Sequence, residues 1–167
     1  MSISKVKVLS AILFSIVILF IESCSRRWTV KEKQEFAQKC SLTDSVQNLA
    51  LELTGFKQNE IENIIVREMH NGKIIDSFYI HPDKNRFDSL RTRSVAWIEH
   101  TIYIKDSYQI VISENQSFIL SDMKMVMWPE YTMFSEGYGC EMGDYKIDGI
   151  RFEHNANPDF VKKGWKE

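Results

Sequence analysis

The sequence predicts a mainly β protein: an antiparallel β-sandwich of about seven or eight strands, preceded by a short N-terminal helix. Short runs of β-branched and aromatic residues recur along the chain, and Gly, Asn and Pro residues separate them at close spacing. No long helical pattern alternates with these runs, which argues against a parallel α/β sheet. Together these observations favour antiparallel sheets packed face to face.

Residues 1–23 have the composition of an export signal. Lys5 and Lys7 supply a small positive region, and residues 8–21 then run for 14 residues without a charge. About 20 apolar residues are needed to cross the hydrocarbon core of a bilayer, whereas the apolar part of a secretory signal has about 7–15. We therefore expect a cleaved signal, with an uncleaved N-terminal anchor as the alternative.

The apolar run ends at Ile21-Glu22-Ser23-Cys24, which resembles the lipobox of bacterial lipoproteins. The resemblance implies that Cys24 is acylated and becomes the new N-terminus, and that this lipid makes the membrane a partner of the chain. Glu22 departs from the small or aliphatic residue that is usual at its position. Cleavage after Ser23 without lipid is the alternative.

The residues directly after Cys24 bear on where the chain is sorted. Ser25, rather than an acidic residue, comes first, which resembles outer-membrane sorting in Gram-negative bacteria. The predicted location is therefore the cell envelope, with the chain lipid-anchored at the outer membrane and facing the periplasm. Arg26 and Arg27 follow, a weak basic signal because lipid-recognition clusters hold about 4–8 such residues.

The expected mature chain, residues 24–167, has 144 residues, the size of one ordinary domain. We divide it into a lipid-anchored N-terminal segment with a short helix, residues 24–46, and a β-sandwich domain, residues 47–167. The formal net charge of the whole chain is −2. A balance this close to neutral gives no electrostatic footprint for nucleic acid, so we expect no nucleic-acid partner.

In addition to Cys24, the proposed lipid site, the chain has two cysteines, Cys40 and Cys140. Export would place them in an oxidising space, where disulfides form and persist. One bridge between them is therefore expected. Two free thiols are the alternative, because pairing cannot be proved from sequence.

A capping box predicts the N-terminal helix. Thr29 offers a hydroxyl to an unpaired amide of the first turn, and Glu32, three residues later, can reach back to the cap. The helix is expected over residues 30–39. Trp28 precedes the cap, where a large apolar residue can pack as a hydrophobic staple.

Alternating patterns and turn residues predict the strands. The pair Asn71-Gly72 separates two β-rich runs and is a strong hairpin signal, because a type I′ turn needs positive φ at both central residues. Residues 81–93, rich in charge, are predicted to form a solvated loop. The predicted strands cover residues 47–54, 64–69, 73–80, 101–104, 108–113 and 117–127, and residues 144–153 are predicted to form a last strand or a hairpin.

Metal-binding patterns are weak in this sequence. His81 and Asp83 are the one local pair that could converge on an ion, but zinc sites need three or four ligands. Neighbouring Glu-His pairs elsewhere would point to opposite faces of a strand. Met123, Met125 and Met127 recur at spacing two, which predicts core filling rather than a methionine metal site. We expect no metal and no cofactor.

Catalytic motifs are equally weak. Gly137 and Gly139 do not continue into a dinucleotide fingerprint, because the third glycine position holds Met142. Cys140 as a nucleophile would need a basic partner that lowers its pKa, and disulfide use explains it better. A Gly-x-Ser-x-Gly nucleophile elbow is absent. We therefore assign no catalytic residue.

An aromatic-rich stretch, residues 128–138, is predicted to form a loop. Its four rings, Trp128, Tyr131, Phe134 and Tyr138, are candidate partner-binding residues. Aromatic side chains bury large areas at small entropy cost, and loops on a rigid sandwich often carry binding residues. The alternative is that these rings cap the open end of the core.

Four segments carry a family resemblance: residues 21–24, 28–40, 51–56 and 108–112. In this order of signal, cysteine, Trp-containing capped helix and strands, the chain resembles small lipoproteins of unknown function from Gram-negative bacteria. The resemblance implies a transthyretin-like or immunoglobulin-like β-sandwich and an envelope location. It implies no activity.

The leading hypothesis is a membrane-anchored, non-catalytic envelope lipoprotein that acts as a binding or structural module. Its expected partners are the membrane, through the lipid on Cys24, and an envelope protein or glycan. The alternative is a small envelope hydrolase with its site at one end of the sandwich. Whether the chain is an enzyme stays open at this point, with the balance against it. The enzyme hypothesis requires a pocket with convergent His or carboxylate groups.

Overall fold

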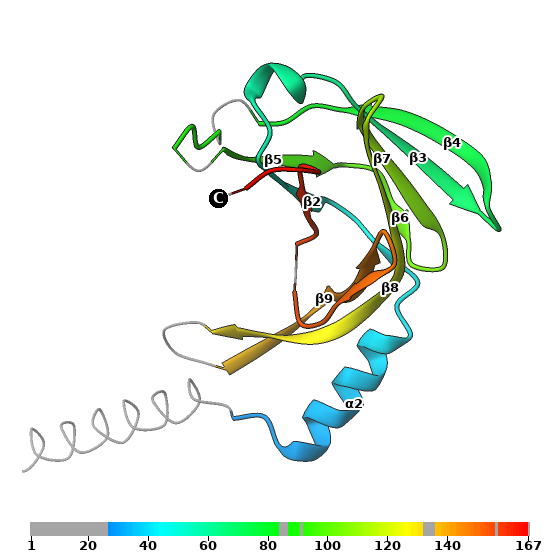
Figure 1. Ribbon diagram of the computed structural model, residues 1–167. Coiled ribbons are helices and arrows are strands. Elements are labelled where there is room, and N and C mark those ends of the chain that lie inside the picture. Colours follow the sequence, from blue (N-terminus) through cyan, green and yellow to red (C-terminus); the bar gives the residue numbers. More distant parts are fainter. Residues whose placement is uncertain (1–26, 84–86, 91, 132–135, 156, 167) are drawn as a thin grey trace, which may run out of the picture.

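The computed structural model describes residues 27–83, 87–90, 92–131, 136–155 and 157–166. Within these ranges the protein is mainly β, with one α-helix on the N-terminal side and eleven strands in three sheets (Figure 1). The predicted fold class is confirmed. No helix in the described ranges is long and apolar enough to cross a membrane. The export segment, Cys24 and Phe134 lie outside the described residues.

The larger sheet has six strands in the order β10-β9-β8-β7-β3-β4, and every neighbouring pair is antiparallel. Strands β7 to β10 follow one another along the chain as hairpins, so local pairing builds most of this sheet. The strands are β3 (Ile64–His70), β4 (Lys73–Ile80), β7 (Ser107–Ser113), β8 (Gln116–Tyr131), β9 (Glu136–Ile147) and β10 (Ile150–Phe152).

The smaller sheets complete the sandwich. In the three-stranded sheet, of order β11-β2-β5, β2 pairs antiparallel with β5 and parallel with β11, so the sandwich is not purely antiparallel. Figure 1 shows the six-stranded sheet curving around this sheet. The strands are β2 (Leu49–Thr54), β5 (Arg93–Ile98) and β11 (Asp159–Val161), and a separate pair is formed by β1 (Ser45–Val46) and β6 (Ile102–Tyr103).

The core lies between the two larger sheets. Strand β2 is buried at five of its six positions, as expected for a strand covered on both faces. Phe118 of β8 meets Phe160 of β11 edge to face, with ring centroids 5.5 Å apart, and so joins the two sheets. Met123 and Met125 are buried in this core, which confirms the predicted core filling, while Met127 is half-buried.

The predicted hairpin turn at Asn71-Gly72 is present. Both residues have positive φ, 50° and 76°, between β3 and β4. The expected C-terminal hairpin also forms, because β9 turns at residues 148–149 into β10. Strand β5 was not predicted, since its residues directly follow a charged segment and mix Arg, Ser and Trp with apolar residues.

The prediction of a loop over residues 128–138 was wrong in the described part. Strand β8 continues to Tyr131, and β9 begins at Glu136. Pro129 is tolerated because, beyond Leu120, only one edge of β8 is paired, with β9. Gly139 leaves room for a neighbour, because a Cβ there would lie 2.1 Å from Oε1 of Glu130.

Helix α2 (Val30–Ser41) begins at the predicted capping box. The Glu32 amide donates to Thr29 Oγ1 at 3.2 Å, and the Thr29 amide donates to Glu32 Oε2 at 2.8 Å. Trp28 packs edge-on against Phe36, with ring centroids 5.3 Å apart. The helix therefore starts from a fixed position.

Helix α2 is tied to the β8–β9 hairpin in three ways. The predicted disulfide between Cys40 and Cys140 is confirmed, with Cα atoms 5.2 Å apart. Trp28 packs edge-on against Tyr138 of β9, with ring centroids 5.2 Å apart. Lys33 Nζ donates to Glu136 Oε1 at 2.8 Å. These contacts fix the N-terminal segment on the sandwich.

Candidate functional site

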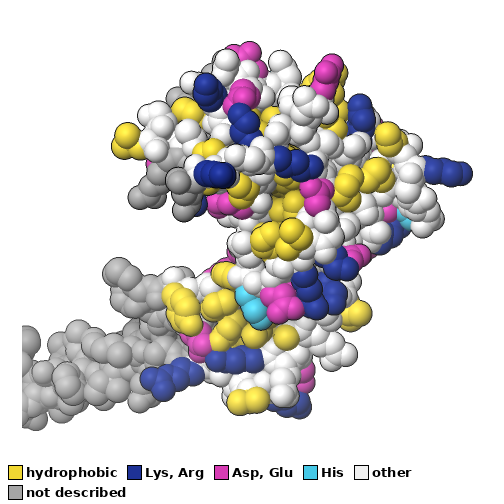
Figure 2. Space-filling model, in the orientation of Figure 1, with side chains coloured by type: hydrophobic (Ala, Val, Ile, Leu, Met, Phe, Trp, Pro, Cys, Tyr) yellow, Lys and Arg dark blue, Asp and Glu magenta, His cyan; other side chains and the backbone are white. Residues whose placement is uncertain are grey.

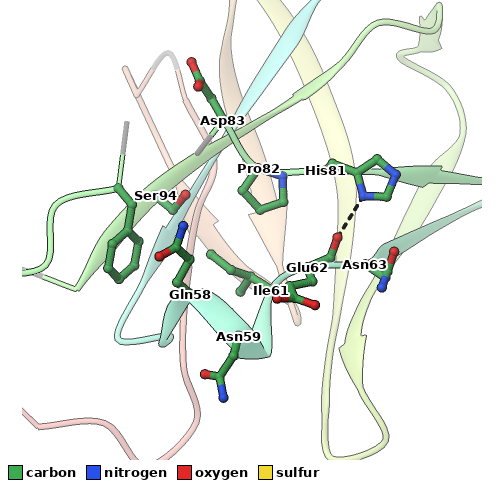
Figure 3. A pocket seen from close by; sticks show the side chains of 10 residues that line it. Gln58, Asn59, Ile61, Glu62, Asn63, His81, Pro82, Asp83 and Ser94 are labelled. Carbon is green, nitrogen blue, oxygen red and sulfur yellow. Dashed lines mark hydrogen bonds between the residues drawn. The ribbon is translucent and has the colours of Figure 1, made fainter. Parts of the chain in front are cut away.

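One pocket lies where the chain crosses between the two larger sheets. The turn η1 (Gln58–Glu60) connects β2 to β3, and residues 81–83 lead from β4 toward β5. Pro82 forms a bridge to Ala96, and the Asp83 amide donates to the Val95 carbonyl at 2.9 Å, so this second crossing lies along β5. Between the two crossings is a pocket of about 630 Å³ (Figure 3).

Uncharged hydrogen-bonding side chains line one side of this pocket. Gln58, Asn59 and Asn63 come from η1 and the approach to β3, and all three are exposed. Among the described residues, no hydrogen bond is formed by their side-chain amides, so these groups are available to a ligand. An amide both donates and accepts, as a ligand hydroxyl does.

Apolar groups form the rest of the lining. Ile61, only 1 % exposed, belongs to the core, and Pro82 and Phe87 are half-buried. A concave site with apolar walls and a few convergent polar groups is the usual construction of a small-molecule site, whose volume is typically about 300–1,000 Å³.

Ser94 is unusual among the lining residues because its buried hydroxyl does not contribute to the stability of the fold through a hydrogen bond. On β5 it shares the inward face with Ala96 and Ile98, and its side chain is 3 % exposed. Within the described part of the chain its Oγ has no hydrogen-bond partner. Leaving a buried polar group unpaired costs about 1–3 kcal/mol, and native proteins contain few of them. Figure 3 shows this side chain beside Gln58 and Pro82.

His81 is held in one orientation by the backbone. Its Nδ1 lies 2.8 Å from the carbonyl oxygen of Glu62, and because a carbonyl only accepts, Nδ1 carries the hydrogen. Figure 3 shows the imidazole and the Asp83 carboxylate pointing apart, so the local pair does not converge on an ion. No group of three metal-ligating side chains exists among the described residues.

The pocket does not present an activated nucleophile. Figure 3 places Ser94 and His81 on opposite sides of Pro82, so the imidazole is not directed at the hydroxyl. Nucleophilic catalysis by serine requires a base within hydrogen-bond reach. Among the described lining residues, Ser94 and His81 therefore do not form a nucleophile–base pair.

A second polar cluster lies at the C-terminal end of β3, whereas the first pocket lies at the start of this strand. His70 Nδ1 lies 2.5 Å from Asp106 Oδ1, and the Asp106 side chain is 3 % exposed. The Tyr108 hydroxyl donates to Glu68 Oε1 at 3.0 Å and accepts from the Tyr103 amide at 2.8 Å. A smaller pocket, about 380 Å³, opens beside Glu68, His70 and Asp106.

The environment of this cluster favours the protonated form of Glu68. Burial raises the pKa of this carboxyl, the neighbouring Asp106 carboxylate raises it further, and the Tyr108 hydroxyl opposes both. Burial likewise raises the pKa of the Tyr108 hydroxyl, which therefore stays protonated and keeps donating. No pattern in the sequence indicated this cluster, because its residues are distant in the chain and meet only through the β3–β7 pairing.

The predicted aromatic residues do not form one exposed cluster in the described part. Tyr131 is 78 % exposed, Trp128 is half-buried, and Tyr138 packs against Trp28. Tyr138 therefore fits the structural alternative, and Tyr131 stays available for contact. The sequence analysis did not identify the pocket residues. Ser94 could have been noticed as a polar residue on the inward face of an alternating segment, but the segment that forms β5 was not predicted to be a strand.

Comparisons with known proteins add no relative. No protein-family model matches the chain, and neither a curated protein nor a solved structure is similar to it.

Proposed function

We propose that this protein is a lipid-anchored, non-catalytic binding module of the cell envelope, and that the pocket between η1 and β5 is its ligand site. The observation that carries the binding role is the lining of this pocket, where exposed amides and apolar groups converge and Ser94 lies in the wall with a buried hydroxyl that has no partner in the described chain. A ligand can bond to the exposed amides directly, and we propose that its entry shifts the lining enough for the ligand also to pair with the Ser94 hydroxyl, which is closed off from solvent without it.

Two features of the chain support the envelope location. The segment before Cys24 resembles a lipoprotein signal, and the Cys40–Cys140 bridge is the kind of link that persists in exported proteins. We place the protein at the outer membrane, facing the periplasm, with its lipid on Cys24.

The ligand class we propose is an uncharged glycan. Gln58, Asn59 and Asn63 offer both donors and acceptors, which suits sugar hydroxyls. The half-buried Phe87 ring adds an apolar surface against which the carbon face of a sugar can pack. The described lining also holds two carboxylates, Glu62 and Asp83, whose oxygens can accept hydrogen bonds from the hydroxyls of a neutral sugar.

Intact-mass analysis of the membrane-fraction protein tests the anchoring. The expected mass is that of a chain beginning at Cys24 plus acyl groups, and the Cys24→Ala variant should lose both the acyl mass and the membrane association. An unmodified chain in the soluble fraction would show that the lipobox resemblance is accidental.

Binding to an array of neutral oligosaccharides built from glucose, galactose, mannose and N-acetylglucosamine tests the ligand site. We expect the full-length chain to bind at least one of these glycans and Ser94→Ala to bind it about fivefold to tenfold more weakly, the effect of one hydrogen bond. Ser77→Ala, at an exposed serine of β4, is the matched control and should bind like the wild type.

A small hydrolase is the second candidate function, because His70, Asp106 and Glu68 converge beside a pocket. A carboxyl whose pKa is raised by its surroundings, as that of Glu68 is by burial, lies closer to the range of a general acid. Hydrolysis of chromogenic esters or glycosides that Asp106→Asn and Glu68→Gln both abolish would favour it. Equal background rates for wild type and variants would remove it.

A further inference from the structure

Lipid attachment at Cys24, part of the function proposed above, limits which end of the molecule can be near the membrane. Four residue steps separate Cys24 from Trp28. A fully extended chain gains at most about 3.3–3.6 Å per residue, so these steps reach at most about 14 Å. Trp28 must therefore lie within about 14 Å of the residue that carries the lipid.

The position of Trp28 on the domain is fixed by several contacts. Its ring packs edge-on against Phe36 of α2 and against Tyr138 of β9. The Cys40–Cys140 bridge holds the same helix on the same hairpin. The short reach from the lipid therefore applies to the whole end of the domain where α2 meets the β8–β9 hairpin.

The side chains at this end belong to the types that favour a membrane interface. Tyr131 pairs across the hairpin with Glu136 and is 78 % exposed. Lys33 donates to Glu136, and its ammonium lies 5.0 Å from the centre of the Tyr138 ring. Trp and Tyr are enriched at the headgroup level of membranes, and basic side chains are attracted to anionic headgroups. We call Trp28, Lys33, Tyr131 and Tyr138 the anchor face.

Hydrophobic side chains also gather on the surface of the hairpin in the space-filling view, with charged side chains of both signs nearby (Figure 2). In Figure 1 the start of α2 and the free end of the hairpin lie on one side of the molecule, and η1 and β5 lie on the other. The anchor face and the ligand pocket are thus at opposite ends.

We infer that the anchor face lies against the headgroup layer of the bilayer that holds the lipid, so that the pocket between η1 and β5 points away from this membrane. The occupant is a lipid surface rather than a second protein, because the tether places this end at the bilayer whatever else the chain binds. The pocket then meets glycans of the periplasmic space rather than lipid headgroups.

Site-specific photo-crosslinking in the native membrane tests this inference. The full-length chain carries benzoylphenylalanine in place of Tyr131, in place of Tyr79, or in place of Asn59. Tyr79 is the matched control, because it is a tyrosine of β4 that is 66 % exposed and lies outside the anchor face. After irradiation, mass spectrometry counts phospholipid adducts on each variant. We expect at least fivefold more lipid adduct at position 131 than at positions 79 and 59.

Four outcomes would overturn the inference. Lipid adducts at position 59 equal to those at position 131 would mean that the domain has no preferred orientation. Protein adducts at position 131 without lipid adducts would show that a partner or a second copy covers the anchor face. A chain without acyl groups by intact mass, which is checked first, would remove the anchoring proposal and this inference together, whereas an acylated chain without lipid adducts removes this inference alone.

Discussion

At the end of the molecule where α2 meets the β8–β9 hairpin, a disulfide, one edge-to-face aromatic pair and an ion pair join segments about 100 residues apart in the chain, and a second aromatic pair, Trp28 with Phe36, fixes the start of the helix. At the opposite end, between η1 and β5, a buried serine hydroxyl has no partner within the described chain and three amides are free of internal hydrogen bonds. One end has its interactions made internally, and the other leaves hydrogen-bonding groups unused.

This difference indicates a division of roles between the ends. A densely connected end opens rarely, because many contacts must break at once. An end with unpaired polar groups gives up stability that a ligand can restore. We therefore expect substitutions at the α2 end to act on stability and substitutions at the pocket to act mainly on binding.

The largest effect should come from the disulfide. Cys40→Ser with Cys140→Ser opens a loop of 100 residues, and the chain-entropy model gives a loss of about 4.7 kcal/mol in the free energy of unfolding for such a loop. Urea unfolding of the double variant measures this loss. The wild-type chain under reducing conditions is the control and should lose a similar amount. A loss below about 1 kcal/mol would mean that the other contacts hold α2 in place alone.

A smaller loss is expected from Trp28→Ala, which removes two aromatic contacts, each worth about 0.5–1.5 kcal/mol. We expect the free energy of unfolding to fall by about 2 kcal/mol in total. Trp97→Ala is the matched control, because Trp97 lies on β5 and is 39 % exposed. Equal losses in both variants would contradict the special role of the α2 end.

The sequence allowed the α2 end to be predicted well. Thr29 and Glu32 form a local pattern whose partners are three residues apart. The same holds away from this end for Asn71-Gly72, which determines the geometry of the turn between β3 and β4. Cys40 and Cys140 could be paired by counting, once export was inferred. In each case the physical cause lies within a few residues or in the scarcity of candidates.

The pocket and the Glu68 cluster could not be predicted in the same way. Ser94 meets Gln58 only because two sheet crossings lie side by side, and Glu68 meets Asp106 only because β3 and β7 pair. Such contacts depend on strand order, which the alternation of residues does not specify. The misassigned 128–138 stretch shows the same limit, since its residues form strands by pairing β8 with β9 across the hairpin.

The Glu68 cluster should make stability depend on pH. The pKa of Glu68 is raised in the folded protein, so the folded state binds a proton more readily than the unfolded state. The contribution of this group is therefore present at low pH and is lost as pH rises from about 4.5 through the folded pKa. Glu68→Gln keeps an acceptor for Tyr108 without the charge. Its stability relative to wild type should rise with pH, by an amount on the order of 1 kcal/mol.

Urea unfolding at pH 4, 5.5 and 7 measures the difference between Glu68→Gln and the wild type. Glu114→Gln, at an exposed turn position, is the control and should show no comparable trend. The lowered pKa values of Glu60 and Glu136 act with the opposite sign, but they are common to both chains and cancel in the difference. A difference that does not grow with pH would show that Glu68 ionises as easily in the folded protein as in the unfolded chain.

The smallest effect on the free energy of unfolding is expected for Ser94→Ala, and it distinguishes the pocket end from the α2 end most clearly. Ser94→Ala removes a buried hydroxyl that has no partner in the described chain, so the free energy of unfolding should stay unchanged or rise by up to about 1 kcal/mol. Thermal unfolding of the ligand-free full-length chain measures this. Thr54→Val is the contrasting variant, because the Thr54 hydroxyl is also buried but donates to Asp159 at 2.8 Å, and its loss should destabilise. If Ser94→Ala destabilised the chain as much as Thr54→Val, the Ser94 hydroxyl would have an internal partner, and its role in ligand binding would lose its physical basis.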